Sequence, residues 1–262
     1  MNTVIYDKIG KTYDSTRRAD PEILARIMRH LSPKKAGYYL DVGCGSGNYT
    51  QALFQKGFNV CGVDISLEML EKARIKSPQI KWVQGDAREL PFPDEVFDGA
   101  ICTLATHHIK DIEMAFREIY RVLHNGCFVI FTSLPEQMQF YWLHEYFPDM
   151  MQKACSVISR FESIAHALRA AGFRNIEQDN FFVTPHLQDL FLHAGKYRPE
   201  LYLDPIVRAG ISTFALEENQ EEVALGCKRI QQDIDSGRIE QVIQSHESGL
   251  GDYAFIVSTK QK

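Results

Sequence analysis

The sequence has no long apolar run and no paired cysteine motif, and each absence excludes a class of protein. No stretch approaches the ~20 consecutive apolar residues needed to cross a bilayer, so we expect no membrane span. None of the six cysteines forms a Cys-x-x-Cys pair, the spacing typical of zinc and redox sites. We therefore expect buried, reduced thiols, no disulfide framework and no structural metal.

The sequence also lacks an excess of basic residues. Lys and Arg number 29 against 34 Asp and Glu, which leaves a net charge of -5. Domains that bind nucleic acid tend to be basic, so we expect no nucleic-acid partner. Residues 1–7 contain no apolar signal core, which favours a cytoplasmic location. The length of 262 residues suits one elaborated domain or two small ones, as a monomer or homodimer.

Short apolar segments alternate with amphipathic ones between residues 38 and 132. We predict strands at 38–42, 59–63, 80–84, 97–102 and 127–132, with helices between them. The helix at 111–123, for example, places four large apolar side chains on one face. Such alternation predicts an α/β fold, in which a doubly wound, Rossmann-like and mostly parallel seven-stranded sheet carries helices on both faces.

The second half of the chain follows a different pattern. We predict a helix at 161–171, a strand near 175–183 and a last strand at 253–257, with a mostly helical segment between the two strands. Three parts follow from this reading. They are an N-terminal helical cap (1–36), a ligand-binding core (37–184 with 251–262) and a helical insertion (185–250) that could cover the sheet edge as a lid or substrate region.

A glycine-rich loop connects the first strand to the next helix. Gly43, Gly45 and Gly47 let the backbone approach a ligand closely at a helix N-terminus. A dinucleotide fingerprint, G-x-G-x-x-G, would place its third glycine at position 48 or 50. Those positions hold Asn48 and Thr50, so the loop disfavours an NAD-dependent oxidoreductase.

Three aspartates stand at the ends of three successive strands. A carboxylate at Asp41 suits an ammonium group, Asp64 suits ribose hydroxyls, and Asp86 can accept from the exocyclic amine of adenine. Aspartates at strand ends can also cap turns, so one of them alone would indicate little. Together with the glycine loop they predict a site for an adenosyl amino acid.

Four segments resemble motifs of the class I S-adenosylmethionine-dependent methyltransferases. Residues 40–47 resemble the first motif, residues 62–66 the ribose-binding segment and residues 85–92 the adenine-binding segment. Residues 121–126 resemble the turn before the fifth strand, although His124-Asn125-Gly126-Cys127 departs from the usual Lys-Pro-Gly-Gly. The resemblance runs from Tyr6 to Thr132 and is greatest to the subgroup of methyltransferase type 11, which includes quinone-biosynthesis enzymes.

This resemblance implies S-adenosylmethionine as cofactor, S-adenosylhomocysteine as product and a small molecule as methyl acceptor. Asp41 and the loop would hold the methionine end, and Thr103 would border the sulfonium. Ile65 and Met69 would flank one face of adenine, with Ala87 near the other. Arg17 would pair with the methionine carboxylate. The implied cofactor-binding residues are Arg17, Asp41, Gly43, Cys44, Gly45, Asn48, Asp64, Ile65, Met69, Gly85, Asp86, Ala87 and Thr103.

Candidate residues for the transfer itself are fewer. His108, or His107 beside it, follows the fourth strand and could act as a general base; the pair could instead only stabilise its loop. Tyr141, His144 and Tyr146 could line an acceptor pocket or pack within a lid. His186 and His193 lie seven residues apart on an expected helix, where a solvated or packed face is favoured over a metal site.

The cofactor motifs do not distinguish an enzyme from a non-catalytic, regulatory protein that binds the cofactor or its product. Nor does the sequence name the acceptor or the attacked O, N, C or S atom. The aromatic and apolar composition of residues 134–157 favours a hydrophobic or aromatic acceptor.

Overall fold

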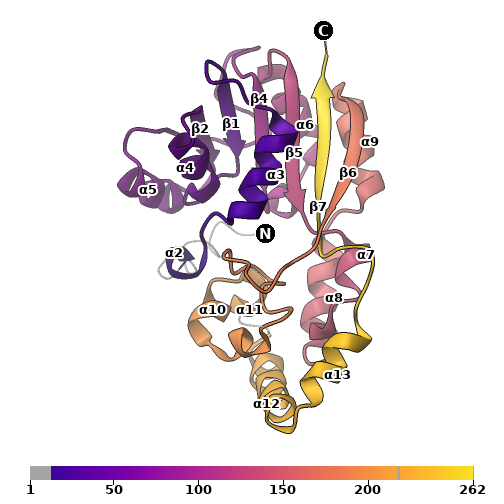
Figure 1. Ribbon diagram of the computed structural model, residues 1–262. Helices are drawn as coiled ribbons and strands as arrows, with labels where there is room; N and C mark the ends of the chain where they lie inside the picture. Colours follow the sequence, from indigo (N-terminus) through magenta and orange to yellow (C-terminus); the bar gives the residue numbers. More distant parts are fainter. Residues whose placement is uncertain (1–12, 217–218, 262) are drawn as a thin grey trace.

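A computed structural model describes residues 13–216 and 219–261, and its centre is a seven-stranded sheet (Figure 1). The strand order is β3-β2-β1-β4-β5-β7-β6. All neighbouring pairs are parallel except those of β7, which runs antiparallel to β5 and β6. The strands are β1 (Tyr38–Val42), β2 (Asn59–Asp64), β3 (Lys81–Gln84), β4 (Gly99–Thr103), β5 (Gly126–Thr132), β6 (Arg174–Phe181) and β7 (Tyr253–Lys260).

Helices cover both faces of this sheet, which confirms the predicted fold class. Successive strand residues point to opposite faces, so Tyr39 joins one apolar core and Leu40 the other. The first core lies under α3 (Pro21–Leu31), α4 (Asn48–Gln55) and α5 (Leu67–Lys76), and the second under α6 (Ile112–Val122) and α9 (Phe161–Ala171). The helix predicted at 161–171 therefore has the expected bounds.

Side-chain caps explain where three of these helices begin. Asp20 accepts hydrogen bonds from the amides of Glu22 and Ile23, and Pro21 fills the first turn of α3. Asp111 caps α6 by accepting from the Met114 amide. Ser66 caps α5 through the amide of Met69, as its position before the apolar pattern predicted.

A second group of helices lies beyond one end of the sheet (Figure 1). It packs around its own apolar cluster, which includes Trp142, Phe147, Met150, Tyr202 and Ile230. The elements are α7 (Pro135–Met138), η2 (Trp142–Glu145), α8 (Pro148–Val157), η3 (Pro199–Leu203), α10 (Pro205–Ala209), α11 (Ser212–Ala215), α12 (Gln220–Ser236) and α13 (Arg238–Ser245). No helix among the described residues has the length and apolarity required to span a bilayer.

One predicted element is wrong. Residues 182–198 form turns and irregular backbone, so His186 and His193 share no helix. Pro185 and Gly195 interrupt the apolar pattern there and favour turns. His193 is buried, with its ring stacked on Tyr141 at a centroid distance of 3.9 Å.

The division of the chain into three parts stays a prediction. Within the predicted cap, α3 packs on β4 and β5 as one of the helices of the sheet layer. The first twelve residues of that cap, and the start of the family resemblance at Tyr6, lie outside the described residues.

Candidate active site

A cavity of about 620 Å³ lies where the parallel strands end and the helical insertion begins. Its wall on the sheet side comes from β1, β2 and β4 and from the loops that follow them. Its opposite wall comes from segments far away in the sequence. The lining residues from these segments include Met138, Met150, Phe191, Leu192, Ile211 and Tyr253. The arrangement matches the rule that ligands of open α/β sheets bind beyond the carboxyl ends of the strands.

The glycine loop borders the cavity with left-handed backbone. Gly45 has a φ of +53°, and a β-carbon there would meet no atom within 4 Å, so the loop leaves room for a ligand. Gly47 has a φ of +78°, and a β-carbon there would overlap the ring of Trp82. Amides of Gly43 and Cys44 donate to Val63 O at 2.8 and 3.1 Å, which holds the loop against β2.

Asp41, the second-last residue of β1, is a buried carboxylate with one unsatisfied oxygen. Its side chain lines the cavity, and Oδ2 accepts from Thr50 Oγ1 at 2.6 Å. Oδ1 is buried and has no partner among the described residues. Burial raises the pKa of Asp41 to about 7; the Thr50 hydrogen bond lowers it, and the nearby Asp64 raises it further. This oxygen can therefore take a donor that the chain itself does not supply.

Asp64 lies at the end of β2 on the same cavity and holds two backbone amides. Oδ2 accepts from Gly45 N at 2.7 Å and Oδ1 from Ser66 N at 2.9 Å. Burial raises the pKa of Asp64, and these backbone hydrogen bonds offset part of the increase. Each carboxylate oxygen has two acceptor positions, so Asp64 can accept from a ligand hydroxyl while it shapes the loop.

Asp86 follows β3 and is paired with Arg88. The shortest contact joins Arg88 Nη2 to Asp86 Oδ2 at 2.6 Å, and hydrogen bonds from Arg88 lower the pKa of Asp86. Both residues line the cavity and both are partly exposed. Ile65, Met69, Gly85 and Ala87 line the same cavity. The structure therefore gathers the three predicted aspartates around one cavity.

The last residue of β4 and the segment after it add three further polar side chains. Thr103 Oγ1 is buried without a partner among the described residues. His107 and His108, in η1 (Thr106–His108), line the cavity with their ring centroids 3.9 Å apart. Burial, and secondarily the charge of Arg17, lowers the pKa of His107 to about 4. His107 Nδ1 is also buried without a described partner, so this imidazole is neutral near pH 7.

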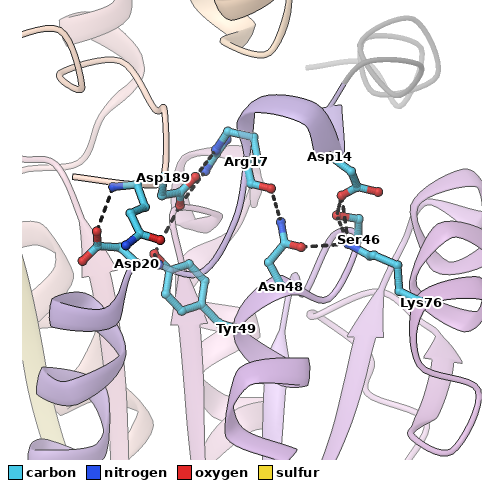
Figure 2. Close-up of polar contacts among 9 residues, drawn as sticks. Asp14, Arg17, Asp20, Ser46, Asn48, Tyr49, Lys76 and Asp189 are labelled. Carbon is cyan, nitrogen blue, oxygen red and sulfur yellow. Dashed lines mark hydrogen bonds and ion pairs between the residues drawn. The ribbon is translucent and has the colours of Figure 1, made fainter. Parts of the chain in front are cut away.

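Arg17 reaches the cavity from the segment between α2 (Tyr13–Thr16) and α3 (Figure 2). Its Nε donates to Asp189 Oδ1 at 2.5 Å and its Nη2 to Oδ2 at 3.3 Å. Asp189 also accepts from Tyr49 OH at 3.2 Å and is itself buried. Asn48 lines the cavity too, and its Nδ2 donates to Arg17 O at 3.1 Å.

Three predicted acceptor residues lie elsewhere. Tyr141, His144 and Tyr146 are absent from the described residues that line the cavity. Tyr141 OH contacts Tyr202 OH at 2.5 Å, and Tyr146 OH donates to Asp233 Oδ2 at 2.6 Å. These side chains are engaged in the insertion, in the packing role that was the alternative for this cluster.

Sequence reasoning missed most of the wall contributed by the insertion. Asp189, Phe191, Leu192 and Ile211 carry no local pattern that marks a ligand site. Asp189 and Arg17 are 172 positions apart, so only the folded chain reveals their pairing. Among the described residues, no three His, Cys, Asp or Glu side chains gather as a metal site would require.

The residues present fit the cofactor that the family resemblance implies. The unsatisfied Asp41 oxygen suits an ammonium group, and the open space beside Gly45 suits close backbone approach. Apolar surfaces of Ile65, Met69 and Ala87 offer walls for a planar base. These residues would thus suit the ammonium group and the adenine base of S-adenosylmethionine.

Comparisons with known proteins agree with this geometry. Residues 40–131 match the model of the methyltransferase domain family. The malonyl-[acyl-carrier protein] O-methyltransferase of Salmonella typhimurium is 34% identical over 148 residues, 55% of this chain and 57% of that protein. The demethylmenaquinone methyltransferase of Streptomyces griseus is 30% identical over 137 residues, 50% of this chain and 60% of that protein. The chain spans about half the length of the curated relatives it matches.

Solved structures extend the likeness over most of the chain. A chain from Anabaena variabilis, described as a methyltransferase from an antibiotic biosynthesis pathway, is 34% identical with a TM-score of 0.85. The match covers 94% of this chain and 99% of that one. Phosphoethanolamine N-methyltransferase 2 of Haemonchus contortus shares the fold, with a TM-score of 0.62 and 21% identity over 99% of this chain and 57% of that one. On the sequence motifs, the fold and these likenesses together, the chain belongs to the class I S-adenosylmethionine-dependent methyltransferases.

Proposed function

We propose that the protein binds S-adenosylmethionine in this cavity and transfers its methyl group to a small-molecule acceptor held against the helical insertion. The observation that carries the proposal is the buried Asp41 Oδ1, which faces no partner among the described residues and lies on the same cavity as Asp64 and Asp86. A buried carboxylate without a partner costs free energy. Its presence beside an open loop therefore supports the binding of a cationic group of a ligand at this position.

Each part of the cofactor has a proposed partner. Asp41 takes the ammonium group, and Arg17 takes the carboxylate of the methionine end. Asp64 takes the ribose hydroxyls, and Asp86 accepts from the adenine amine. Thr103 borders the sulfonium, and Ile65 and Met69 flank the base. The supporting observation is that all of these residues line one cavity.

Methyl transfer depends mainly on alignment and on the exclusion of water. The cofactor, when bound, supplies a methyl group that is already activated on a sulfonium. The chain must hold an acceptor atom in line with that methyl group, and such alignment can supply roughly 7–11 kcal/mol. Met138, Met150, Phe191 and Leu192 line the cavity, and apolar side chains of this kind favour a hydrophobic or aromatic acceptor.

His107 is the proposed base for an acceptor that carries a proton. Its ring lines the cavity, and its Nδ1 has no described partner. The depressed pKa of about 4 keeps the imidazole unprotonated near pH 7, so a ring nitrogen can accept a hydrogen bond from an acceptor hydroxyl. A base this weak takes the proton only as the new bond to the methyl carbon makes that hydroxyl acidic. His108, whose ring lies beside it at a centroid distance of 3.9 Å, is the second candidate for the same role.

Calorimetric titration with S-adenosylmethionine tests the cofactor site. We expect the wild type to bind at sub-millimolar concentration and Asp64→Ala to lose most of that affinity. Asp94→Ala, which removes an exposed carboxylate paired with Arg121, is the matched control and should bind like the wild type. Absence of wild-type binding, or unchanged binding in Asp64→Ala, would overturn the proposal.

Label transfer separates an enzyme from a protein that only binds the cofactor. The protein is incubated with methyl-labelled cofactor and a metabolite extract, and labelled products are sought. We expect one or a few labelled small molecules, formed about a hundredfold more slowly by His107→Asn if His107 is the base. Cofactor binding without transfer to any component would favour the regulatory alternative.

A further inference from the structure

Residues 14–20 form a strap that connects the glycine loop to the start of the helical insertion (Figure 2). On the insertion side, Leu190 N donates to Thr16 O at 3.1 Å and Gln188 N to Asp20 Oδ2 at 2.9 Å. Arg17 lies in the middle of the strap, and Asp189 holds its guanidinium. These contacts hold Arg17 from the insertion side, and the strap is held at its other end, at Asp14, by a second set of contacts.

Lys76, the last residue of α5, fixes that end. Its Nζ lies 2.8 Å from Asp14 Oδ1, 3.1 Å from Ser46 Oγ and 2.7 Å from Asn48 Oδ1. A lysine ammonium has three donors, and here they engage the strap, the glycine loop and the start of α4. Ser46 Oγ in turn donates to Asp14 Oδ1 at 2.6 Å, which closes the network.

The contact with Asn48 transmits the effect of Lys76 to Arg17. An ammonium can only donate, so it selects the oxygen of the Asn48 side-chain amide and turns the NH₂ group the other way. That NH₂ group, Nδ2, donates to Arg17 O at 3.1 Å. The backbone of Arg17 is thereby held from the α5 side, while Asp189 holds its side chain from the insertion side.

We propose that Lys76 is a positioning residue for cofactor recognition: through Asp14 and Asn48 it places Arg17 at the amino-acid end of the cofactor. This inference rests on the proposed function, in which Arg17 receives the methionine carboxylate. Lys76 itself is absent from the described residues that line the cavity, so it acts through Arg17 and not by contact with the ligand.

Two ligands that differ only at the amino-acid end test the inference. S-adenosylhomocysteine carries the carboxylate, whereas 5′-deoxy-5′-methylthioadenosine keeps the adenosine and the thioether but lacks the amino acid. We expect Lys76→Met to weaken binding of the first about tenfold and of the second less than twofold. In an Arg17→Gln background the same change should add less than twofold, because residues that act through one another are not additive.

Lys72→Met is the matched control. Lys72 lies one turn earlier on α5, and its Nζ is 3.4 Å from Glu68 Oε1 on the same helix. This variant should bind both ligands like the wild type. Lys76→Arg, which keeps a cation at the site, should recover part of the affinity for S-adenosylhomocysteine.

Four outcomes would overturn the inference. Equal weakening of both ligands by Lys76→Met would indicate a purely structural role. A full additional loss in the Arg17→Gln background would show that Lys76 acts independently of Arg17. Selective loss in Arg17→Gln without loss in Lys76→Met would reject this inference alone, whereas no wild-type binding would reject the proposed function too. If Lys76→Met does not fold, Asp14→Ala replaces it, with the same selective loss expected.

Discussion

At the scale of single residues, the site depends on a carboxylate whose ionisation the fold opposes. Burial raises the pKa of Asp41 to about 7, although a free aspartate titrates near pH 4. No described group donates a hydrogen bond to Oδ1, so nothing at that oxygen stabilises the charged form. A cationic ligand group would reverse the shift, because it stabilises the charged form.

Cofactor affinity should therefore fall as the pH falls below 7. Below that pH, Asp41 is protonated in the ligand-free protein and must lose its proton before it can pair with an ammonium group. We expect the dissociation constant of S-adenosylhomocysteine to rise by up to about tenfold per pH unit between pH 7 and 5. Calorimetry across this range measures it, with Asp41→Asn as the weakly binding reference. Wild-type affinity that is constant over the range would contradict the assignment.

The same residue should weaken the ligand-free fold. A carboxyl whose folded pKa is raised stabilises the protein fully below its unfolded pKa, near 4, and loses that contribution as the pH rises through about 7. At pH 8, Asp41→Asn should therefore increase the free energy of unfolding by about 2 kcal/mol while cofactor binding is lost. Urea denaturation at pH 8 and at pH 5 measures the free energy of unfolding of the variant and of the wild type. A variant less stable than the wild type at pH 8 would refute this expectation.

At the scale of elements, the glycine loop combines a ligand role with a packing role. Gly47→Ala forces a side chain into left-handed backbone and against the Trp82 ring. We expect it to cost about 2–4 kcal/mol in the free energy of unfolding. Gly237→Ala is the control: its φ is also positive, at +76°, but a β-carbon there meets no atom within 4 Å, so only the backbone cost remains. Chemical denaturation of the two variants should separate these contributions, and equal losses would show that Trp82 makes no difference.

Elements were also where prediction from sequence succeeded and failed most plainly. The pattern around Phe116 and Ile119 identified α6, and Ser66 identified the start of α5, because periodicity and capping act within a few residues. The segment around His193 was misread as a helix. The His193 ring packs against Tyr141 and Tyr253, and the Phe191 ring packs against Tyr253, so the spacing of these residues reflects tertiary contacts and not a helical period.

At the scale of the whole molecule, one buried ion pair joins the insertion to the sheet. Lys196 Nζ lies 2.8 and 2.9 Å from the two carboxylate oxygens of Asp252, which precedes β7. Asp252 Oδ2 also accepts from Val183 N at 2.8 Å, just after β6. The two ends of the segment that leaves and re-enters the sheet are thereby tied together.

Removal of one partner of this pair should be strongly destabilising. Lys196→Met leaves a buried carboxylate without its cation, which typically costs about 3–5 kcal/mol. The exposed pair of Arg117 with Glu113, at 3.5 Å, offers a control: Arg117→Met should cost less than about 1 kcal/mol. Urea denaturation compares the two variants. If both lose the same small amount, the Lys196–Asp252 pair does not hold the insertion in place.

By itself, the sequence determined the sheet, its glycine loop and the three aspartates at the strand ends, because each depends on signals within one turn or strand. It also determined that the aspartates meet, because parallel strands bring their carboxyl ends to one edge. Only the tertiary structure decided which residues complete the cavity. Arg17 meets Asp189 across 172 positions, and Lys76 reaches Asp14 across 62. Such partners leave no periodic trace, because the free energy that brings them together comes from the packing of the whole fold.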